Sequence, residues 1–484
     1  MDGEKKIQLK RVFGYRWGTS FLIVKIIGMG IFVAPTGVLK YCHMNVGLSL
    51  CVWAACAPLA VIDALCSAEI GVTFPCSGAQ YYFLLRCFGS GVSFLNLWTS
   101  LFLGPGTMAS QALLLAKYSI QPFFPGCPAP GLPTRCLALA FLWVVGILSS
   151  RGVKEVAWLQ VASTVLKMAI LGLISLSGVV LLATGREENV ASFQNPFQAE
   201  YPDASHLIQA FYQGWFAYLG GGALTFIAGE VENPGRTIPK CILTALPLVT
   251  VLYLLVNVSY LAVLTPREIL SSDTVAAMWT HRVFPSLAWV VPFGISASLF
   301  GSLMMNMFQL SRVAYIAGQE GQLPALFHML NGHSSPSLAV LLFVTIASIA
   351  VISMDLIELI NYLNFVFYIW TVLSMIGILK LRRQEPDLPR PYKVFLPFPL
   401  VAMAVSLCLV LIPLVKSPHM YYMHICLFIL SGLLVYVPFV HFKWKLAGFQ
   451  TMTCHLQLLF NICVPDVSDE PTSEAERVKK KAAF

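Results

Sequence analysis

Charged residues are scarce in this chain, and that scarcity excludes most soluble folds. Asp, Glu, Lys and Arg make up 11% of the 484 residues, whereas a soluble domain usually has about 25%. Hydrophobic residues make up 57%, which places the chain among multi-pass membrane proteins. The net charge of +8 does not indicate a nucleic-acid partner, because the basic residues fall in short loops and tails.

Sequence motifs of several enzyme classes are also missing. The 13 cysteines form no CxxC pair and no Cys/His cluster with zinc spacing, so we expect neither a metal site nor a cofactor. No GxxxxGK(S/T) motif occurs, which argues against ATP-driven pumping by this chain. The 9 histidines fall in or near loops and span ends, without a carboxylate at a catalytic spacing. This disfavours the alternative of a membrane-embedded enzyme such as an acyltransferase.

The chain does contain a series of long apolar runs. A membrane-spanning helix needs roughly 20 apolar residues. We predict twelve spans, at about residues 17–39, 46–70, 92–119, 136–149, 155–183, 206–228, 240–264, 287–310, 337–353, 357–379, 394–415 and 421–442. They form a transporter domain of residues 17–446, preceded by residues 1–16 and followed by a tail of residues 447–484. Residues 1–16 are polar and basic, and the next run is too long for a signal-peptide core, so we expect no cleaved signal.

The basic residues predict the orientation of these spans, because cytoplasmic loops of membrane proteins are rich in Lys and Arg. If the N-terminus is inside, the inner segments carry most of the basic residues. The outer segments then hold only Lys40, Lys117, Arg135, Arg186, Arg267, Arg282 and Lys416. Both termini are therefore predicted to be cytoplasmic.

Two predicted spans contain glycine clusters that would interrupt a helix. One cluster is at residues 28–30 in the first span, and the other is at residues 220–222 in the sixth. Unwound backbone survives in a membrane only where it lines a cavity or is buried in protein. Broken helices in corresponding spans indicate a substrate site near the bilayer midplane. The alternative is that these glycines only allow close helix packing.

The spacing of the two breaks suggests a repeat. An offset of five spans predicts two five-helix repeats of inverted orientation plus two extra helices, which is the LeuT-like architecture. A broken helix exposes N–H groups that favour a carboxylate and carbonyl groups that accept from an ammonium group. The two breaks together fit both ends of an α-amino acid. We therefore predict an all-α membrane transporter of amino acids.

Three charged residues, Lys25, Asp63 and Lys167, lie well away from the ends of predicted spans, where charge is costly and usually functional. Lys167 lies deep in the fifth span, and its ammonium group could take the place of a sodium ion; a lysine that snorkels to the surface is the alternative. Lys25 lies one turn before Gly28 and could read a negative substrate side chain. Alternatively, Lys25 and Asp63 neutralise each other as an ion pair.

Several other polar residues have less specific interpretations. Asn306, Asn361 and Asn364 lie in predicted spans, and we expect them to make packing hydrogen bonds; the alternative is that they line a cavity. Asn257 begins a glycosylation sequon, but this sequon lies inside the seventh span and we expect it to be unmodified.

Cys127 lies in a predicted outward loop, residues 121–132, where the compartment is oxidising. A single exposed cysteine there suggests an intermolecular disulfide. Pairing with Cys136 is the alternative. Cys136 begins an apolar run and is expected to be buried, which favours the intermolecular bond.

Short motifs along the chain resemble the light subunits of heteromeric amino acid transporters. The motifs are IIGMGIFVAPTGVL at residues 26–39, CSAEIG at 66–71, FAY at 216–218, ENP at 232–234 and RPYKV at 390–394. The similarity covers about residues 10–445. Residues 95–103 and 458–463 are most similar to a branch of the family that carries aspartate and glutamate.

The resemblance implies a twelve-helix LeuT-like fold and sodium-independent amino acid exchange. It assigns substrate binding to the two breaks, at Ile26, Gly28, Met29, Gly30, Phe216 and Leu219. Backbone groups at Met29 and Gly30 would hold the substrate carboxylate. Carbonyl groups of Ile26, Phe216 and Leu219 would hold the ammonium group, and the Phe216 ring would act as a gate.

The resemblance also implies a partner. Cys127 matches the cysteine that bridges to a single-pass glycoprotein heavy subunit, here the kidney type known as rBAT. Lys167 matches the lysine that the family has in its fifth span. The implied location is the plasma membrane, specifically the apical membrane of kidney epithelium.

Some positions depart from the family pattern. Met29 stands where the family often has serine, and Gly221 stands where it has a bulky residue. The cystine/glutamate exchanger has arginines at the positions of Gly104 and Phe367. Leu219 replaces the acid of members that carry cationic amino acids, which disfavours lysine and arginine as substrates. We predict a carrier of acidic amino acids or cystine, with neutral amino acids as the alternative.

Overall fold

The computed structural model describes residues 14–74, 79–124, 129–150, 154–272, 274–319, 321–331, 335–416 and 420–442, and also Thr453, His455, Gln457, Leu458, Ile462 and Cys463. The α-helices are α1 Tyr15–Ile26, α2 Gly30–Tyr41, α3 Val46–Thr73, α4 Ala79–Phe88, α5 Ser90–Ile120, α6 Gly131–Ser149, α7 Lys154–Ala183, α8 Glu187–Gln194, α9 Ala204–Ala217, α10 Pro234–Val263, α11 Pro266–Ser271, α12 Val275–Val283, α13 Val290–Gln319, α14 Ser337–Ser353, α15 Leu356–Gln384, α16 Pro397–Lys416 and α17 Met420–Val435. The remaining elements are the 3₁₀-helices η1 Gln121–Phe123, η2 Ala223–Glu230, η3 Pro285–Leu287 and η4 Ala325–His328, the π-helix η5 Tyr436–His441, and the strands β1 Leu330–Asn331 and β2 Ile462–Cys463.

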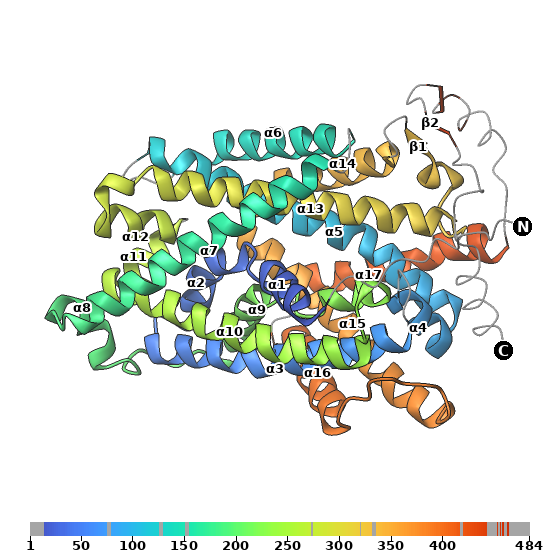
Figure 1. Ribbon diagram of the computed structural model, residues 1–484, viewed down its shortest axis with the longest axis horizontal. Coiled ribbons are helices and arrows are strands. Elements are labelled where there is room, and N and C mark those ends of the chain that lie inside the picture. The colour runs from blue at the N-terminus through green and yellow to red at the C-terminus, as the bar shows by residue number, and fades with distance from the viewer. Residues whose placement is uncertain are drawn as a thin grey trace, which may run out of the picture.

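The long helices form an elongated bundle (Figure 1). One end of the bundle carries α4, β1 and β2, and we call it the α4 end; the opposite end carries α8, α11 and α12, and we call it the α8 end. Among the described residues, six helices are long and apolar enough to cross a membrane: Val46–Thr73, Gly131–Ser149, Val165–Ala183, Pro234–Val263, Val290–Tyr315 and Leu356–Gln384. Shorter apolar helices are Ser337–Ser353, Pro397–Ile412 and Tyr422–Pro438. These helices make the chain a multi-pass membrane protein, as its composition predicts.

Both glycine clusters interrupt helices, as the sequence predicts. α1 ends at Ile26 and α2 begins at Gly30, and residues 218–222 separate α9 from η2. Gly220 has φ of +105°, a conformation that residues with a Cβ rarely adopt. A Cβ at Gly220 would also lie 2.8 Å from the carbonyl oxygen of Lys25. The shape of the second break therefore depends on glycine at this position.

Short elements lie in connections that the sequence analysis treats as loops or tail. α4, α8, α11 and α12 are four such helices, and β1 pairs with β2 of the C-terminal segment in antiparallel register. α11 begins with a capping box formed by Thr265 and Glu268. Hydrogen bonds from Arg282 lower the pKa of Glu268 to about 2. α11 is therefore stabilised by a local cap and an ion pair, which a hydropathy pattern does not reveal.

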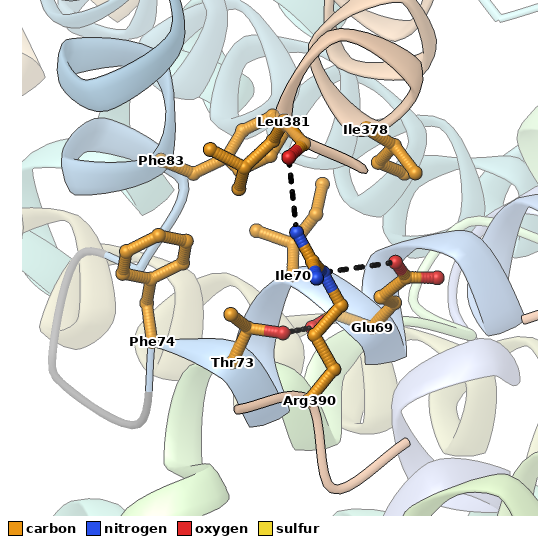
Figure 2. A pocket seen from close by; sticks show the side chains of 8 residues that line it. All are labelled: Glu69, Ile70, Thr73, Phe74, Phe83, Ile378, Leu381 and Arg390. Atoms are coloured by element: carbon orange, nitrogen blue, oxygen red, sulfur yellow. Dashed lines mark hydrogen bonds and ion pairs between the residues drawn. The ribbon is translucent and has the colours of Figure 1, made fainter. Parts of the chain in front are cut away.

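A buried carboxylate joins α3 to the segment that follows α15, near the α4 end. Glu69 accepts hydrogen bonds from the Arg382 Nε at 3.0 Å and from the Val394 N–H at 2.9 Å. Figure 2 shows Arg390 between Glu69 and the Leu381 carbonyl, to which it donates at 3.1 Å. The Arg390 Nε lies 4.0 Å from the Glu69 carboxylate. These donors compensate a charge that would be strongly destabilising if left alone.

α7 and α10 approach each other closely at Gly178, where only the small side chain of Ser259 lies between their backbones. A Cβ at Gly178 would lie 2.3 Å from the Ser259 Cβ, and the Ser259 hydroxyl donates to the Ile174 carbonyl at 2.9 Å. Gly172 of the same helix is different, because nothing lies within 4 Å of a Cβ built there. The contact at Gly178 therefore holds α7 against α10.

The first prediction concerns this contact. Gly178→Ala is expected to lower the melting temperature of the purified protein in detergent, because the added methyl group overlaps Ser259 and overpacking costs about 1–3 kcal/mol. Gly172→Ala is the matched control. It removes a glycine from a helix interior without a clash, so it should be neutral or stabilising by up to about 1 kcal/mol. Equal melting temperatures for the two variants would contradict the contact.

Candidate substrate site at two broken helices

The two breaks touch each other in the interior of the bundle. A Cβ at Gly30 would lie 2.4 Å from the Ala217 Cα, so the start of α2 meets the end of α9 backbone to backbone. In the same way, Gly220 touches the last turn of α1 at the Lys25 carbonyl. Segments far apart in the sequence are thus brought together by glycines that leave no side chain between them.

One tyrosine of α10 joins the two breaks. The Tyr253 hydroxyl lies 3.0 Å from the carbonyl oxygens of Ile26 and of Ala217, so its proton is available to either one. The Ile26 carbonyl also accepts from the Gly28 N–H at 2.8 Å. The resemblance predicts that Ile26 binds a substrate ammonium group. In this conformation such a group would replace one of the two present donors.

The start of α2 offers N–H donors. Within the described part of the chain, the N–H groups of Met29 and Gly30 donate to no carbonyl, and no side chain caps α2. Both residues are buried. Since a helix N-terminus carries a partial positive charge, these donors can bind an anion. Their assignment to a substrate carboxylate stays a prediction.

Phe216 and Leu219 lie at the second break. Phe216 is buried and Leu219 is half-buried. The Phe216 carbonyl accepts from the Leu219 N–H at 3.4 Å, which is a long contact, and the Tyr218 N–H is shared between this carbonyl and that of Trp215. The roles predicted for the two carbonyl groups, and for the Phe216 ring as a gate, stay predictions.

Lys167 forms a buried link between two helices. Its ammonium group donates to the Ser302 hydroxyl of α13 at 2.6 Å, and Ser302 donates to the Ser298 carbonyl at 3.1 Å. Lys167 is 2% exposed, so it does not snorkel to the surface. It is a fixed positive charge inside the bundle, and its substitution for sodium stays a prediction.

Lys25 does not form the ion pair with Asp63 that was one of its two interpretations. Its ammonium group lies 5.9 Å from the centroid of the Phe21 ring and within electrostatic range of Lys167. The second break explains this separation, because Gly220 packs on Lys25 whereas Gly221 packs on Ala64, next to Asp63. Among the described side chains, neither lysine has a carboxylate partner.

The amide side chains in the spans make packing hydrogen bonds, as expected. Asn306 donates to the Gln111 side chain of α5 at 2.9 Å, and Asn361 donates to the Tyr41 hydroxyl at 3.1 Å. Asn364 donates to a backbone carbonyl of α9 at 3.0 Å. These bonds hold α5, α9, α13 and α15 around the breaks.

The expectations for cysteines and for the sequon have different outcomes. Cys127 lies outside the described residues, so its disulfide stays a prediction. The expected burial of Cys136 is wrong: it is exposed, with a free thiol, because the first turns of α6 face away from the bundle.

Asn257 is buried in α10 and donates to the Tyr253 carbonyl at 2.8 Å, so the sequon lies inside a spanning helix as predicted.

The sequence analysis missed Tyr253 and Ser302. Both occur in apolar runs, where a single hydroxyl is easily taken for a packing residue. One signal was available, because buried hydroxyl groups in proteins are usually hydrogen-bonded. That rule predicts that these side chains have partners, but it does not say which ones.

A helical bundle with two facing breaks is the arrangement of a membrane carrier. Residues 16–440 match the amino acid permease family. The chain belongs to this family and is an amino acid transporter.

Named relatives cover almost the whole chain. It is 66% identical, over 97% of its length and 100% of the relative, to solute carrier family 7 member 13 of Homo sapiens. It is 64% identical to the protein of the same name from Mus musculus, over 98% of this chain and 99% of the relative. It is 35% identical, over 96% of both chains, to b(0,+)-type amino acid transporter 1 of Homo sapiens. All are named as carriers or transporters, so the chain is not an enzyme.

The second prediction concerns the bridge between the breaks. Tyr253→Phe should destabilise the protein by about 1 kcal/mol, because it removes a buried hydrogen bond. It should also lower amino acid uptake, since the two breaks lose their common tether. Tyr260→Phe is the matched control. Tyr260 is also buried on α10, but its hydroxyl has no partner among the described residues, so its loss should leave stability and uptake unchanged.

The measurements are thermal unfolding in detergent and uptake of radiolabelled amino acids into proteoliposomes. If the two variants behave alike in both assays, Tyr253 does not hold the breaks together.

Proposed function

We propose that this chain is a sodium-independent exchanger of acidic amino acids or cystine that works by alternating access. One observation carries the proposal: the start of α2 has buried N–H donors without a described acceptor and packs on the last residue of α9 at the second break, in a bundle that also holds two ammonium groups without a described carboxylate partner. An acidic amino acid has two carboxylates and one ammonium group. It can therefore use the helix N-terminus, the carbonyl groups at the breaks and a lysine at the same time.

The proposed architecture has twelve spans, with two inverted five-helix repeats in residues 17–446 and both termini in the cytoplasm. It is supported by the interruption of α1/α2 and α9/η2, which occupy the first and sixth predicted spans. In alternating access, one set of helices rocks against the other around a fixed central site. Breaks that touch through glycine backbone can serve as such a centre.

The amino acid backbone of the substrate would bind at the breaks. The N–H groups of Met29 and Gly30, in the stretch that starts at Gly28, would hold its carboxylate. Its ammonium group would bind the carbonyl groups of Phe216, Leu219 and Ile26. The Ile26 carbonyl already has two donors, so substrate binding there requires that Tyr253 or Gly28 gives way. The Phe216 ring would close over the substrate as a gate.

The two lysines would have separate roles. Lys167 is fixed by Ser302 between α7 and α13, which suits a permanent substitute for a bound cation. Lys25 has no carboxylate partner among the described side chains and lies 5.9 Å from the centroid of the Phe21 ring, so its ammonium group remains available to a carboxylate. We assign the substrate side chain to Lys25. If Lys25 does not read this side chain, Lys25 is a structural charge and the side chain is left to backbone donors alone.

The proposed partner is a single-pass glycoprotein heavy subunit of the rBAT type, bound through a disulfide at Cys127. The family resemblance supports this assignment, together with the oxidising compartment expected outside the cell. The proposed location is the plasma membrane, at the apical surface of kidney epithelium.

The third prediction tests the function. Proteoliposomes should take up radiolabelled aspartate, glutamate or cystine, and uptake should be unchanged when choline replaces sodium. Lys25→Gln should reduce aspartate uptake while neutral amino acid uptake is retained, because a carboxylate needs a positive partner in a low-dielectric site. Lys40→Gln, at the exposed end of α2, is the control and should change neither. A strict sodium requirement would refute the proposal.

The fourth prediction concerns Cys127. A non-reducing gel of native membranes should show a heavy band that collapses with reductant, and Cys127→Ser should remove it. Cys136→Ser is the matched control, since Cys136 is exposed and could itself form a bond. If Cys136→Ser removes the band and Cys127→Ser does not, the linkage is at Cys136.

A further inference from the structure

One carboxylate inside the bundle has no explanation in the proposed site. Asp63 lies well inside α3, in an apolar part of this spanning helix, and is half-buried. Within the part of the chain that the structure describes, its carboxylate takes part in no hydrogen bond and no ion pair. Glu69 of the same helix is different, because Arg382 and the Val394 N–H satisfy its oxygens.

Within the described part of the chain, none of the cationic groups near α3 forms an ion pair with Asp63. Arg382 of α15 is bonded to Glu69, and Lys25 of α1 lies against Phe21. Arg86 of α4 is bonded to Glu385 at 2.8 Å.

The ionisable side chains that do lie within electrostatic range of Asp63 are neutral ones. Among those described, they are the Cys66 thiol, one turn along α3, and the Tyr368 hydroxyl of α15. The Tyr368 hydroxyl is buried and has no hydrogen-bond partner among the described residues. Two polar groups in this region are therefore without partners.

An unpaired carboxylate in an apolar medium is strongly destabilised in its charged form. Without a cation, the simplest way to remove this cost is to bind a proton. Intramembrane acids that lack a structural partner are typical of proton pathways in carriers.

The position of Asp63 links it to the second break. The next residue, Ala64, would lie 3.4 Å from a Cβ built at Gly221, and Ser67 would lie 3.3 Å from one built at Gly222. Further along α3, Gly71 is in close contact with Thr225 of η2. This face of α3 therefore packs along the second break. A rearrangement of the break changes the surroundings of Asp63.

We infer that Asp63 is a proton-binding site whose occupancy is coupled to the movement of the second break. The carboxylate takes up one proton on one side of the membrane and releases it on the other. This inference rests on the proposed transport function. An acidic amino acid of net charge −1 that enters with one proton crosses the membrane without net charge transfer.

The first experiment does not depend on the substrate. Infrared spectra of the full-length protein in lipid should contain the carbonyl band of a protonated carboxylic acid at neutral pH, and this band should disappear at alkaline pH. Asp63→Asn should lack the band and Asp63→Glu should retain it. Glu358→Gln is the control, because Glu358 is exposed at the start of α15. An identical band in the parent protein and in Asp63→Asn would overturn the inference.

The second experiment measures coupling with aspartate as the probe. Proteoliposomes with a trapped pH-sensitive dye should acidify when aspartate enters, and an acidic outer solution should increase accumulation. Asp63→Asn should lose both effects, while exchange of labelled for unlabelled aspartate continues. Equal acidification by Asp63→Asn and the parent would refute coupling. Absence of uptake of any amino acid by the parent would instead refute the transport proposal, and the infrared result would still decide the protonation of Asp63.

Discussion

The interior of this bundle depends on how interrupted backbone finds hydrogen-bond partners where water is absent. A continuous helix satisfies its own N–H and carbonyl groups, whereas a broken helix cannot. Here the start of α2 meets the end of α9, and the Tyr253 hydroxyl of α10 lies within hydrogen-bonding distance of the last carbonyl of α1 and of α9, so its one proton can go to either. The N–H groups that begin α2 are left without described acceptors. Because the carbonyl side is capped and the N–H side is open, the junction favours an anion as its ligand.

The two carboxylates of α3 show how one helix can carry a structural and a functional charge. Glu69 is held by several donors and anchors the segment after α15, so changing its charge would loosen the fold. Asp63 has no such donors within the described residues, so its charge can change without breaking an existing bond. The difference is one of environment, since both residues lie inside the same apolar helix.

The breaks could be predicted from the sequence because glycine adopts backbone conformations that other residues avoid, as Gly220 does here. It also predicted that Lys167 is buried, since a central lysine of a spanning helix cannot reach the surface. It did not predict Tyr253, whose partners lie on two other helices. The interpretation of Lys25 and Asp63 as an ion pair is wrong for the same reason. The hydrophobic pattern does not show that the second break lies between these two residues. Exposure of Cys136 was missed because an apolar residue in a membrane protein need not face the protein interior.

The close contact between Gly178 and Ser259 determines whether α7 and α10 can move independently of each other. Ser259 sits against backbone and donates to the Ile174 carbonyl, so α7 and α10 cannot slide past each other without losing both the fit and the bond. α10 carries Tyr253, and α7 carries Lys167. The tyrosine that joins the breaks and the buried lysine are therefore carried by two helices that move as one rigid unit. A displacement at Tyr253 is transmitted to Lys167, and the reverse, because no flexible side chain separates the helices at Gly178.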